Sequence, residues 1–152
     1  MAGAKRFEDL LMWQRSRALA NVIYKLTEGS DFRDASLRNQ MRRAAVSVMS
    51  NIAEGFGRGT NEELLKFLFI AKGSLTELQS QLYLSLDLHY TSQEQFKNVQ
   101  NLCAETARLI QAFASSMNSR LTRGFKHKRK VIPWPERAKR MMSEPSGESE
   151  KA

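Results

Sequence analysis

Residues 42–58 read Arg-Arg-Ala-Ala-Val-Ser-Val-Met-Ser-Asn-Ile-Ala-Glu-Gly-Phe-Gly-Arg and combine an arginine pair, a run of small and apolar residues, and a glycine-rich end. Apolar residues recur here at the spacing of one face of an α-helix. That face consists of Leu37, Met41, Ala44, Ala45, Val48 and Ile52. We expect a helix from about Ala35 to Glu54 that Gly55 ends, because glycine adopts the left-handed cap conformation at little cost. Its small residues predict close packing, and its arginines place positive charge at the rim.

The same periodicity predicts three further helices, and no segment shows the alternation typical of a strand. They are expected from about Glu8 to Thr27, from Thr60 to about Leu88, and from Thr91 onward. The last two begin with a threonine followed three residues later by a glutamate, the pattern of a capping box. Short connections make sequential helices antiparallel. The sequence therefore predicts an all-α, antiparallel up-down-up-down four-helix bundle.

The helical pattern stops after Arg120, so we expect a bundle over residues 1–121 and a basic, flexible tail over 122–152 that is largely disordered. The whole chain has a net charge of +8, and the residues from Arg123 onward hold nine Lys/Arg and four Glu. A basic excess predicts an anionic partner, with RNA or DNA the commonest and acidic membranes or proteins the alternatives. Membrane binding is less favoured because the tail has no clear amphipathic period.

The arginines of the second helix and the basic tail are the candidate nucleic-acid contacts. Guanidinium groups bind phosphate oxygens in pairs, and aromatic side chains stack on bases. The candidates are Arg38, Arg42, Arg43, Arg58, Arg123, Lys126, Lys128, Arg129, Lys130 and Trp134. The helical arginines could instead pair with Glu54, Asp34 or a neighbouring subunit, or stay solvated. The tail could instead aid solubility, or dock Trp134 on the bundle.

No residue pattern favours catalysis, a metal or a cofactor, so we expect a non-enzymatic protein. Cys103 falls on the core face of the fourth helix, and neither His89 nor His127 has a visible nucleophile or metal partner. The glycines after the second helix follow a helix rather than a strand and lack the lysine of a phosphate-binding loop. A single cysteine, no signal peptide and no membrane-length apolar run predict a cytoplasmic location.

The first and third helices carry more apolar surface than a four-helix monomer is expected to bury. A helix packed on one side needs an apolar arc of about 100°. The residues in excess are Trp13, Tyr24, Phe69, Ile70, Tyr83, Leu84 and Leu88. Large exposed apolar patches mark partner surfaces, so we expect a homo-oligomer formed through these two helices. The alternative is that deep packing within the bundle covers both stripes.

Five groups of residues together resemble the bacterial four-helix-bundle family first noticed as open reading frames in intervening sequences of 23S ribosomal RNA genes. They are Phe7-Glu8-Asp9-Leu10 with Trp13-Gln14, Ile23-Tyr24-Lys25-Leu26-Thr27, Arg42-Arg43-Ala44-Ala45-Val46-Ser47, Asn51-Ile52-Ala53-Glu54-Gly55 with Gly57-Arg58, and Ile70-Ala71-Lys72-Gly73-Ser74-Leu75 with Glu77. The resemblance covers about residues 7–118. The basic tail lies outside it.

The resemblance implies a ring-like homopentamer with a basic surface. The family includes the accessory variability determinant of diversity-generating retroelements, which implies a non-catalytic partner of a reverse transcriptase and its template RNA. The predicted function is therefore a nucleic-acid-binding accessory protein. The alternative is a protein-interaction scaffold that binds no nucleic acid.

Overall fold

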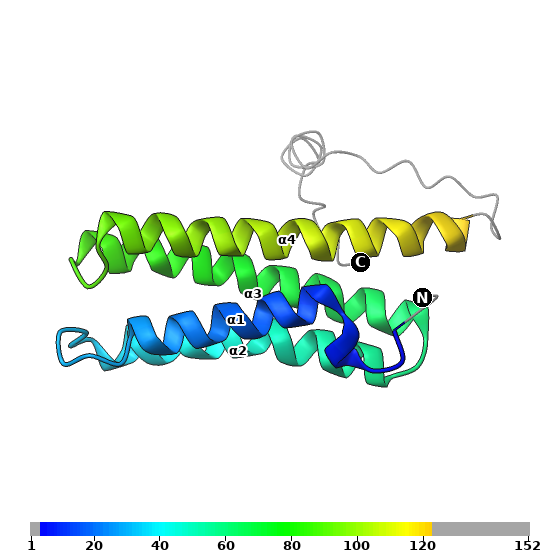
Figure 1. Cartoon of the computed structure of the whole chain (residues 1–152), viewed down its shortest axis with the longest axis horizontal. Coiled ribbons are helices and arrows are strands. Elements are labelled where there is room, and N and C mark those ends of the chain that lie inside the picture. Colours follow the sequence, from blue (N-terminus) through cyan, green and yellow to red (C-terminus); the bar gives the residue numbers. More distant parts are fainter. Residues whose placement is uncertain (1–3, 123–152) are drawn as a thin grey trace, which may run out of the picture.

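The computed structural model describes residues 4–122 and shows a bundle of long helices (Figure 1). The elements are the 3-10 turn η1 (Phe7–Asp9) and the helices α1 (Leu11–Leu26), α2 (Ala35–Gly57), α3 (Asn61–Asp87) and α4 (Gln93–Thr122). Every regular element in this described range is helical, which confirms the predicted fold class. The tail was predicted to be disordered, and its residues from Arg123 onward lie outside the described part of the chain.

The four helices pack in a closed cycle, α1 on α2, α2 on α3, α3 on α4 and α4 on α1. Figure 1 shows that neighbours in this cycle run antiparallel, which confirms the up-down-up-down bundle. Within the described residues no Cα atom of α1 lies within 8 Å of one in α3, and the same holds for α2 and α4. The two helices with excess apolar surface, α1 and α3, therefore occupy opposite corners of the bundle.

Large aliphatic side chains fill the space between the helices. The most deeply buried include Leu19, Ile23, Met41, Val48, Ile52, Leu64, Leu68, Leu75, Leu78, Leu82 and Ile110. Each such side chain contributes about 1.5–3 kcal/mol relative to its exposed state. The buried hydroxyls of Ser16 and Thr106 donate to the carbonyl four residues earlier, so they are satisfied within their own helices.

Helix α2 continues three residues beyond its predicted end, and Gly55 lies inside it. A Cβ at Gly55 would sit 2.7 Å from Cβ of Phe67, so the missing side chain lets α2 and α3 approach closely. Gly59, with φ of +78°, takes the left-handed conformation instead. The hydroxyl of Thr60 then caps α3 by accepting the N–H of Glu63 at 3.3 Å, which is half of the predicted capping box. The Glu63 carboxylate instead pairs with Lys66 at 2.6 Å. The prediction that Gly55 ends the helix is wrong, because the glycine serves packing between helices rather than a turn.

Helix α1 begins three residues later than predicted. The preceding residues form η1, in which the Asp9 carboxylate accepts the backbone N–H groups of Lys5 and Arg6 at 3.1 and 3.0 Å. Leu10 is extended, with φ −77° and ψ 120°, and interrupts the helical path. The local hydrogen bonds of Asp9 thus compete with a regular helix start.

The cap of α4 lies one residue after the predicted one. The Ser92 hydroxyl accepts the N–H of Gln95 at 3.1 Å, and Oε1 of Gln95 accepts the N–H of Ser92 at 2.9 Å. This is a complete capping box. Thr91, the predicted cap, is buried and hydrogen-bonded to the hydroxyl of Ser85. Because both Thr91 and Ser92 can cap a helix, the sequence alone did not separate them.

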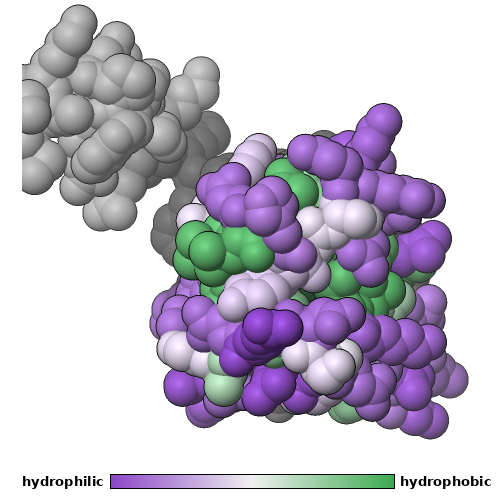
Figure 2. Space-filling model, turned by 90° about the vertical axis from the view of Figure 1, so that its left-hand side faces the viewer, coloured by the Kyte–Doolittle hydropathy of each residue, from purple (hydrophilic) through white to green (hydrophobic). Residues whose placement is uncertain are grey.

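Hydrophobic residues also reach the surface of the bundle. Figure 2 looks onto the end formed by the α1–α2 and α3–α4 connections and shows hydrophobic residues gathered at separate places between hydrophilic ones. None of the helices within residues 4–122 is long and apolar enough to cross a bilayer.

Candidate nucleic-acid interface

Arg42 is fixed at the boundary between α1 and α2. Its Nε–H donates to Oγ1 of Thr27 at 2.8 Å, and Nη2 donates to the Thr27 carbonyl at 3.1 Å. Its Cζ lies 4.7 Å from the centroid of the Tyr24 ring, a cation–π contact. Thr27 is the C-cap of α1, where the helix dipole favours a cation. The structural partner of Arg42 is therefore the end of α1, not the carboxylate of Glu54 or Asp34.

Arg38 and Arg43 lie on the same helix as Arg42 but are less constrained. Arg38 is half-buried and Arg43 is exposed, and neither side chain forms an ion pair among the described residues. Their charges remain available to a ligand.

Arg43 borders two open hollows on either side of α2. The hollow toward α1 has a volume of about 570 Å³ and is lined by Tyr24, Asn39, Arg42, Arg43, Val46 and Ser47. The hollow toward α3 has a volume of about 340 Å³ and is lined by Gln40, Arg43, Ala44, Ser47 and Glu77. A carboxylate is part of the second lining but not of the first, so the α1–α2 hollow is the more cationic of the two.

Arg58 lies at the C-terminal end of α2, where Glu54 offsets its charge. The Nη2 of Arg58 is 2.6 Å from Oε1 of Glu54, and its Cζ lies 5.5 Å from the centroid of the Phe67 ring. The hydrogen bond to Glu54 raises the pKa of Arg58. A phosphate would have to displace this carboxylate, so Arg58 is the least available of the four predicted arginines on α2.

The remaining predicted nucleic-acid contacts lie outside the described residues. They are Arg123, Lys126, Lys128, Arg129, Lys130 and Trp134. Their part in binding stays a prediction.

The side chains of α3 and of its C-cap Leu88 that were predicted to mediate self-association are exposed. Their exposed fractions are 58% for Phe69, 51% for Ile70, 59% for Tyr83, 48% for Leu84 and 45% for Leu88. Gly73 and Ser80 lie between them on the same side of the helix. A Cβ at Gly73 would meet nothing within 4 Å, so packing within the chain does not require a glycine there.

Of the two residues predicted to be exposed on α1, Tyr24 is 45% exposed but Trp13 is not open to solvent in the same way. The Trp13 ring is half-buried and packs edge-on against Phe7, at 5.0 Å between centroids. Leu11 and Val22 are 51% and 38% exposed and lie three turns apart on one face. Tyr24 projects roughly 200° around the helix from Val22, toward α2. Helical spacing could have identified Leu11 and Val22.

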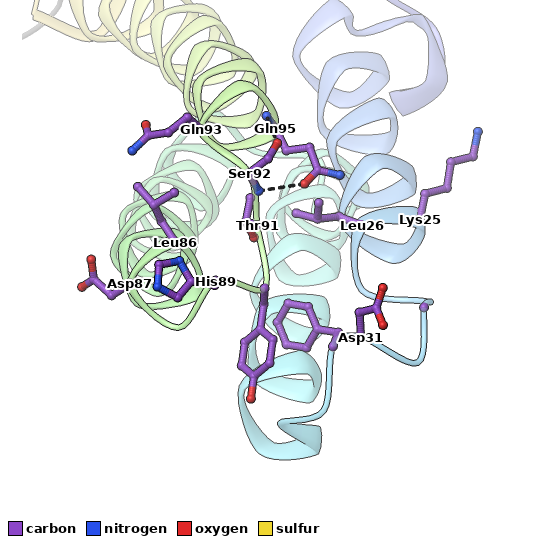
Figure 3. A pocket seen from close by; sticks show the side chains of 13 residues that line it. Lys25, Leu26, Asp31, Leu86, Asp87, His89, Thr91, Ser92, Gln93 and Gln95 are labelled. Atoms are coloured by element: carbon purple, nitrogen blue, oxygen red, sulfur yellow. Dashed lines mark hydrogen bonds between the residues drawn. The ribbon is translucent and has the colours of Figure 1, made fainter.

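A third hollow, of about 880 Å³, lies where the α1–α2 and α3–α4 connections meet (Figure 3). The rings of Phe32 and Tyr90 stack beside it, with centroids 4.7 Å apart. Figure 3 shows Asp31 and Asp87 on opposite sides of this hollow. Lys25 also lines this hollow, so two carboxylates face one lysine there. This charge is unsuited to binding phosphate.

The described residues show no metal-binding cluster, since no three His, Cys, Asp or Glu side chains lie close enough to hold an ion. Cys103 is completely buried, and desolvation raises the pKa of its thiol to about 12. The thiol is therefore protonated at neutral pH, as expected for a core residue.

These features define an all-α class of protein, a four-helix bundle with arginines along its second helix and exposed apolar side chains on the two helices at opposite corners. The chain belongs to the 23S rRNA-intervening sequence protein family, whose sequence model matches residues 8–112. This confirms the family resemblance of the sequence motifs.

A solved structure of similar fold comes from Bacteroides thetaiotaomicron and is a protein of unknown function from the S23 ribosomal protein family. It has a TM-score of 0.64 and 21% sequence identity, and the match covers 68% of this chain and 98% of that one. At this identity the likeness concerns the fold alone. The comparison with curated proteins gives no match.

Proposed function

We propose that this chain is a non-enzymatic, cytoplasmic, nucleic-acid-binding protein that assembles into a homopentameric ring. The observation that carries the binding function is the outward side of α2, where Arg42 and Arg43 line one hollow whose lining contains no carboxylate. Cationic contacts of this kind bind the phosphate backbone and position a nucleic acid with little sequence readout. The basic tail adds charge to the same function.

The arrangement of the exposed apolar residues supports assembly into a ring. The Leu11–Val22 face belongs to α1 and the larger apolar face to α3, and these helices are at opposite corners of the bundle. If the α1 face of one copy packs on the α3 face of the next, each interface is heterologous. Heterologous interfaces close into rings when the rotation between subunits allows it. Five subunits is the number that the family resemblance implies.

The α3 face has the shape that a partner helix requires. Gly73 and Ser80 form a low strip between bulkier apolar side chains, which suits packing of ridges into grooves. Gly73→Leu adds apolar surface without a clash inside the subunit but fills this strip. We expect it to abolish the oligomer in light scattering, whereas non-specific hydrophobic association would become stronger.

A complementation experiment tests the ring directly. Val22→Glu disables the α1 face and Leu84→Glu the α3 face, so each purified variant should be monomeric. Mixed together, the two variants retain one intact pair of faces and should form a one-to-one heterodimer by native mass spectrometry. An interface between two α3 faces would instead leave Val22→Glu fully oligomeric, and a monomeric wild-type protein would refute the proposed assembly.

Nucleic-acid binding is tested with nuclease-treated full-length protein and a labelled RNA across a salt series. Affinity should fall steeply with salt, because phosphate contacts release counterions. Replacing Lys126, Lys128, Arg129 and Lys130 by glutamine measures the tail, and Arg38→Gln with Arg43→Gln measures α2. Failure of the wild-type protein to bind RNA at low salt would leave the protein-interaction scaffold as the better function.

The most concrete form of this proposal is an accessory subunit of a reverse transcriptase that gathers template RNA on the basic ring. Its support is the family resemblance. A neighbouring reverse-transcriptase gene, and co-purification of its product with this protein in an RNA-dependent manner, are the expected results. A gene neighbourhood without a reverse transcriptase would contradict this form while leaving nucleic-acid binding intact.

A further inference from the structure

The hollow between α1 and α2 differs from the other hollows described above in its charge. The bundle-end hollow contains Asp31 and Asp87, and the α2–α3 hollow contains Glu77. The α1–α2 hollow contains two arginines and no carboxylate, together with the polar side chains of Asn39 and Ser47 and the ring of Tyr24. It is an open hollow with a volume of about 570 Å³.

Arg42 is oriented in this hollow before any ligand binds. Its two hydrogen bonds to Thr27 use two of the five N–H groups of the guanidinium, which leaves three. The cation–π contact with Tyr24 restricts the rotation of the same group further. A cation held in this way loses little conformational entropy on binding an anion. Arg43 adds a second, unpaired cation at the border of the hollow.

Tyr24 provides an aromatic surface beside these cations. Arg42 lies against its ring, yet 45% of the residue remains exposed. Sites for single-stranded nucleic acid combine a basic groove with an aromatic ring on which a base stacks. A duplex keeps its bases stacked inside and offers such a ring only the backbone. The combination of Tyr24 with two arginines therefore favours a single strand.

We propose that the α1–α2 hollow binds one nucleotide of single-stranded nucleic acid, with its phosphate on Arg42 and Arg43 and its base on Tyr24. This inference deepens the proposed nucleic-acid binding and rests on it. It assigns Tyr24 to the ligand rather than to self-association, in agreement with its position away from the Leu11–Val22 face.

Four substitutions in the full-length protein test the site, two at Tyr24 and one each at Arg43 and Arg108. Tyr24→Leu removes the ring and keeps an apolar cover over Arg42, whereas Tyr24→Phe keeps the ring. Arg43→Gln removes an exposed charge without breaking an ion pair in the described residues, and Arg108→Gln, on the exposed side of α4, makes the same change in net charge elsewhere. Circular dichroism of each variant checks that the fold is retained.

The measurement is fluorescence anisotropy with a labelled 12-nucleotide RNA, used as a single strand and annealed to its complement. Wild-type protein should prefer the single strand. Tyr24→Leu should weaken single-strand binding about tenfold and duplex binding little, with Tyr24→Phe near wild type. Arg43→Gln should weaken binding and lower the salt dependence by about one ion, more than Arg108→Gln does.

Photocrosslinking with the same RNA carrying 4-thiouridine provides an independent readout. Trypsin cleaves after Arg17 and Lys25, so the crosslink should appear on the Ala18–Lys25 peptide that contains Tyr24. If wild-type protein binds RNA but Tyr24→Leu and Arg43→Gln bind as Arg108→Gln does, the inference is overturned and the proposed function stands. If wild-type protein binds neither form of RNA, the proposed function itself fails.

Discussion

Arg42 connects the N-terminal half of α2 to the end of α1 through two hydrogen bonds to a single residue, Thr27, at 2.8 and 3.1 Å. The Thr27 hydroxyl accepts from Arg42 and donates to the Ile23 carbonyl at 2.8 Å, so both of its roles are used inside the fold. This contact holds the end of α1 in place, and it also positions the guanidinium of Arg42 at the α1–α2 hollow.

The Arg42–Thr27 contact is expected to contribute measurably to stability. Arg42→Met should lower the free energy of unfolding by about 1.5 kcal/mol, the lower end of the range for hydrogen bonds to charged groups, since Arg42 is half-buried. Arg43→Met is the matched control, because this neighbour is exposed, and it should change stability by less than about 0.5 kcal/mol. Urea denaturation at fixed protein concentration measures the free energy of unfolding of both variants. Equal effects would show that the Arg42–Thr27 contact does not contribute to stability.

Because α2 and α3 approach closely at Gly55, we expect that adding a single methyl group there lowers the free energy of unfolding substantially. Gly55→Ala places a Cβ 2.7 Å from that of Phe67 and 3.3 Å from Cα of Leu64. Overpacking of this kind costs roughly 1–3 kcal/mol. Gly57→Ala, where a Cβ meets nothing within 4 Å, should be neutral or stabilising. The midpoint temperature of thermal unfolding should therefore fall for Gly55→Ala and stay unchanged or rise for Gly57→Ala.

The buried hydroxyl pair of Ser85 and Thr91 joins the end of α3 to the start of α4. Ser85→Ala or Thr91→Val alone leaves one buried hydroxyl without its partner and should cost about 1–3 kcal/mol. The double variant removes both groups and should cost less than the sum of the two single changes. A double-mutant cycle by urea denaturation measures the coupling energy between the two hydroxyls. Strictly additive changes in the free energy of unfolding would contradict the expected coupling.

The buried thiol of Cys103 predicts a loss of stability at alkaline pH. Burial raises its pKa to about 12 in the folded protein, above the value of about 8.5 for an unfolded chain. The folded state holds the proton that the unfolded chain releases, so the contribution is complete below pH of about 8.5 and declines as pH rises toward 12. Cys103→Ala should remove this part of the pH dependence of unfolding, and identical pH profiles would contradict it.

Helical spacing predicted the bundle because the same periodicity that creates an apolar face also determines which side chains become buried. Leu37, Met41, Val48 and Ile52 are buried on α2 as the pattern required. Spacing could not show the function of Gly55, since a helix end and a tight helix contact both select glycine. The difference depends on Phe67, which belongs to another helix.

The candidate site was only partly predictable for the same reason. The sequence indicated Arg42 and Arg43 as outward cations on α2. It could not show that Arg42 meets Thr27, 15 residues earlier, or that Tyr24 lies over its guanidinium. Contacts between separate helices depend on the rotation of each helix about its own axis. Periodicity shows which face of a helix is buried, but it does not give that rotation closely enough to pair individual side chains.

By itself the sequence determined the helical class, the order and approximate bounds of the helices, the apolar core and the family, because these follow from local spacing and residue type. The tertiary structure alone decided that α1 and α3 stand at opposite corners, that Leu11 and Val22 rather than Trp13 form the open α1 face, and that Tyr24 joins the arginines. These features arise from how four amphipathic helices share one core, and many pairings of their faces satisfy the same sequence pattern until packing selects one.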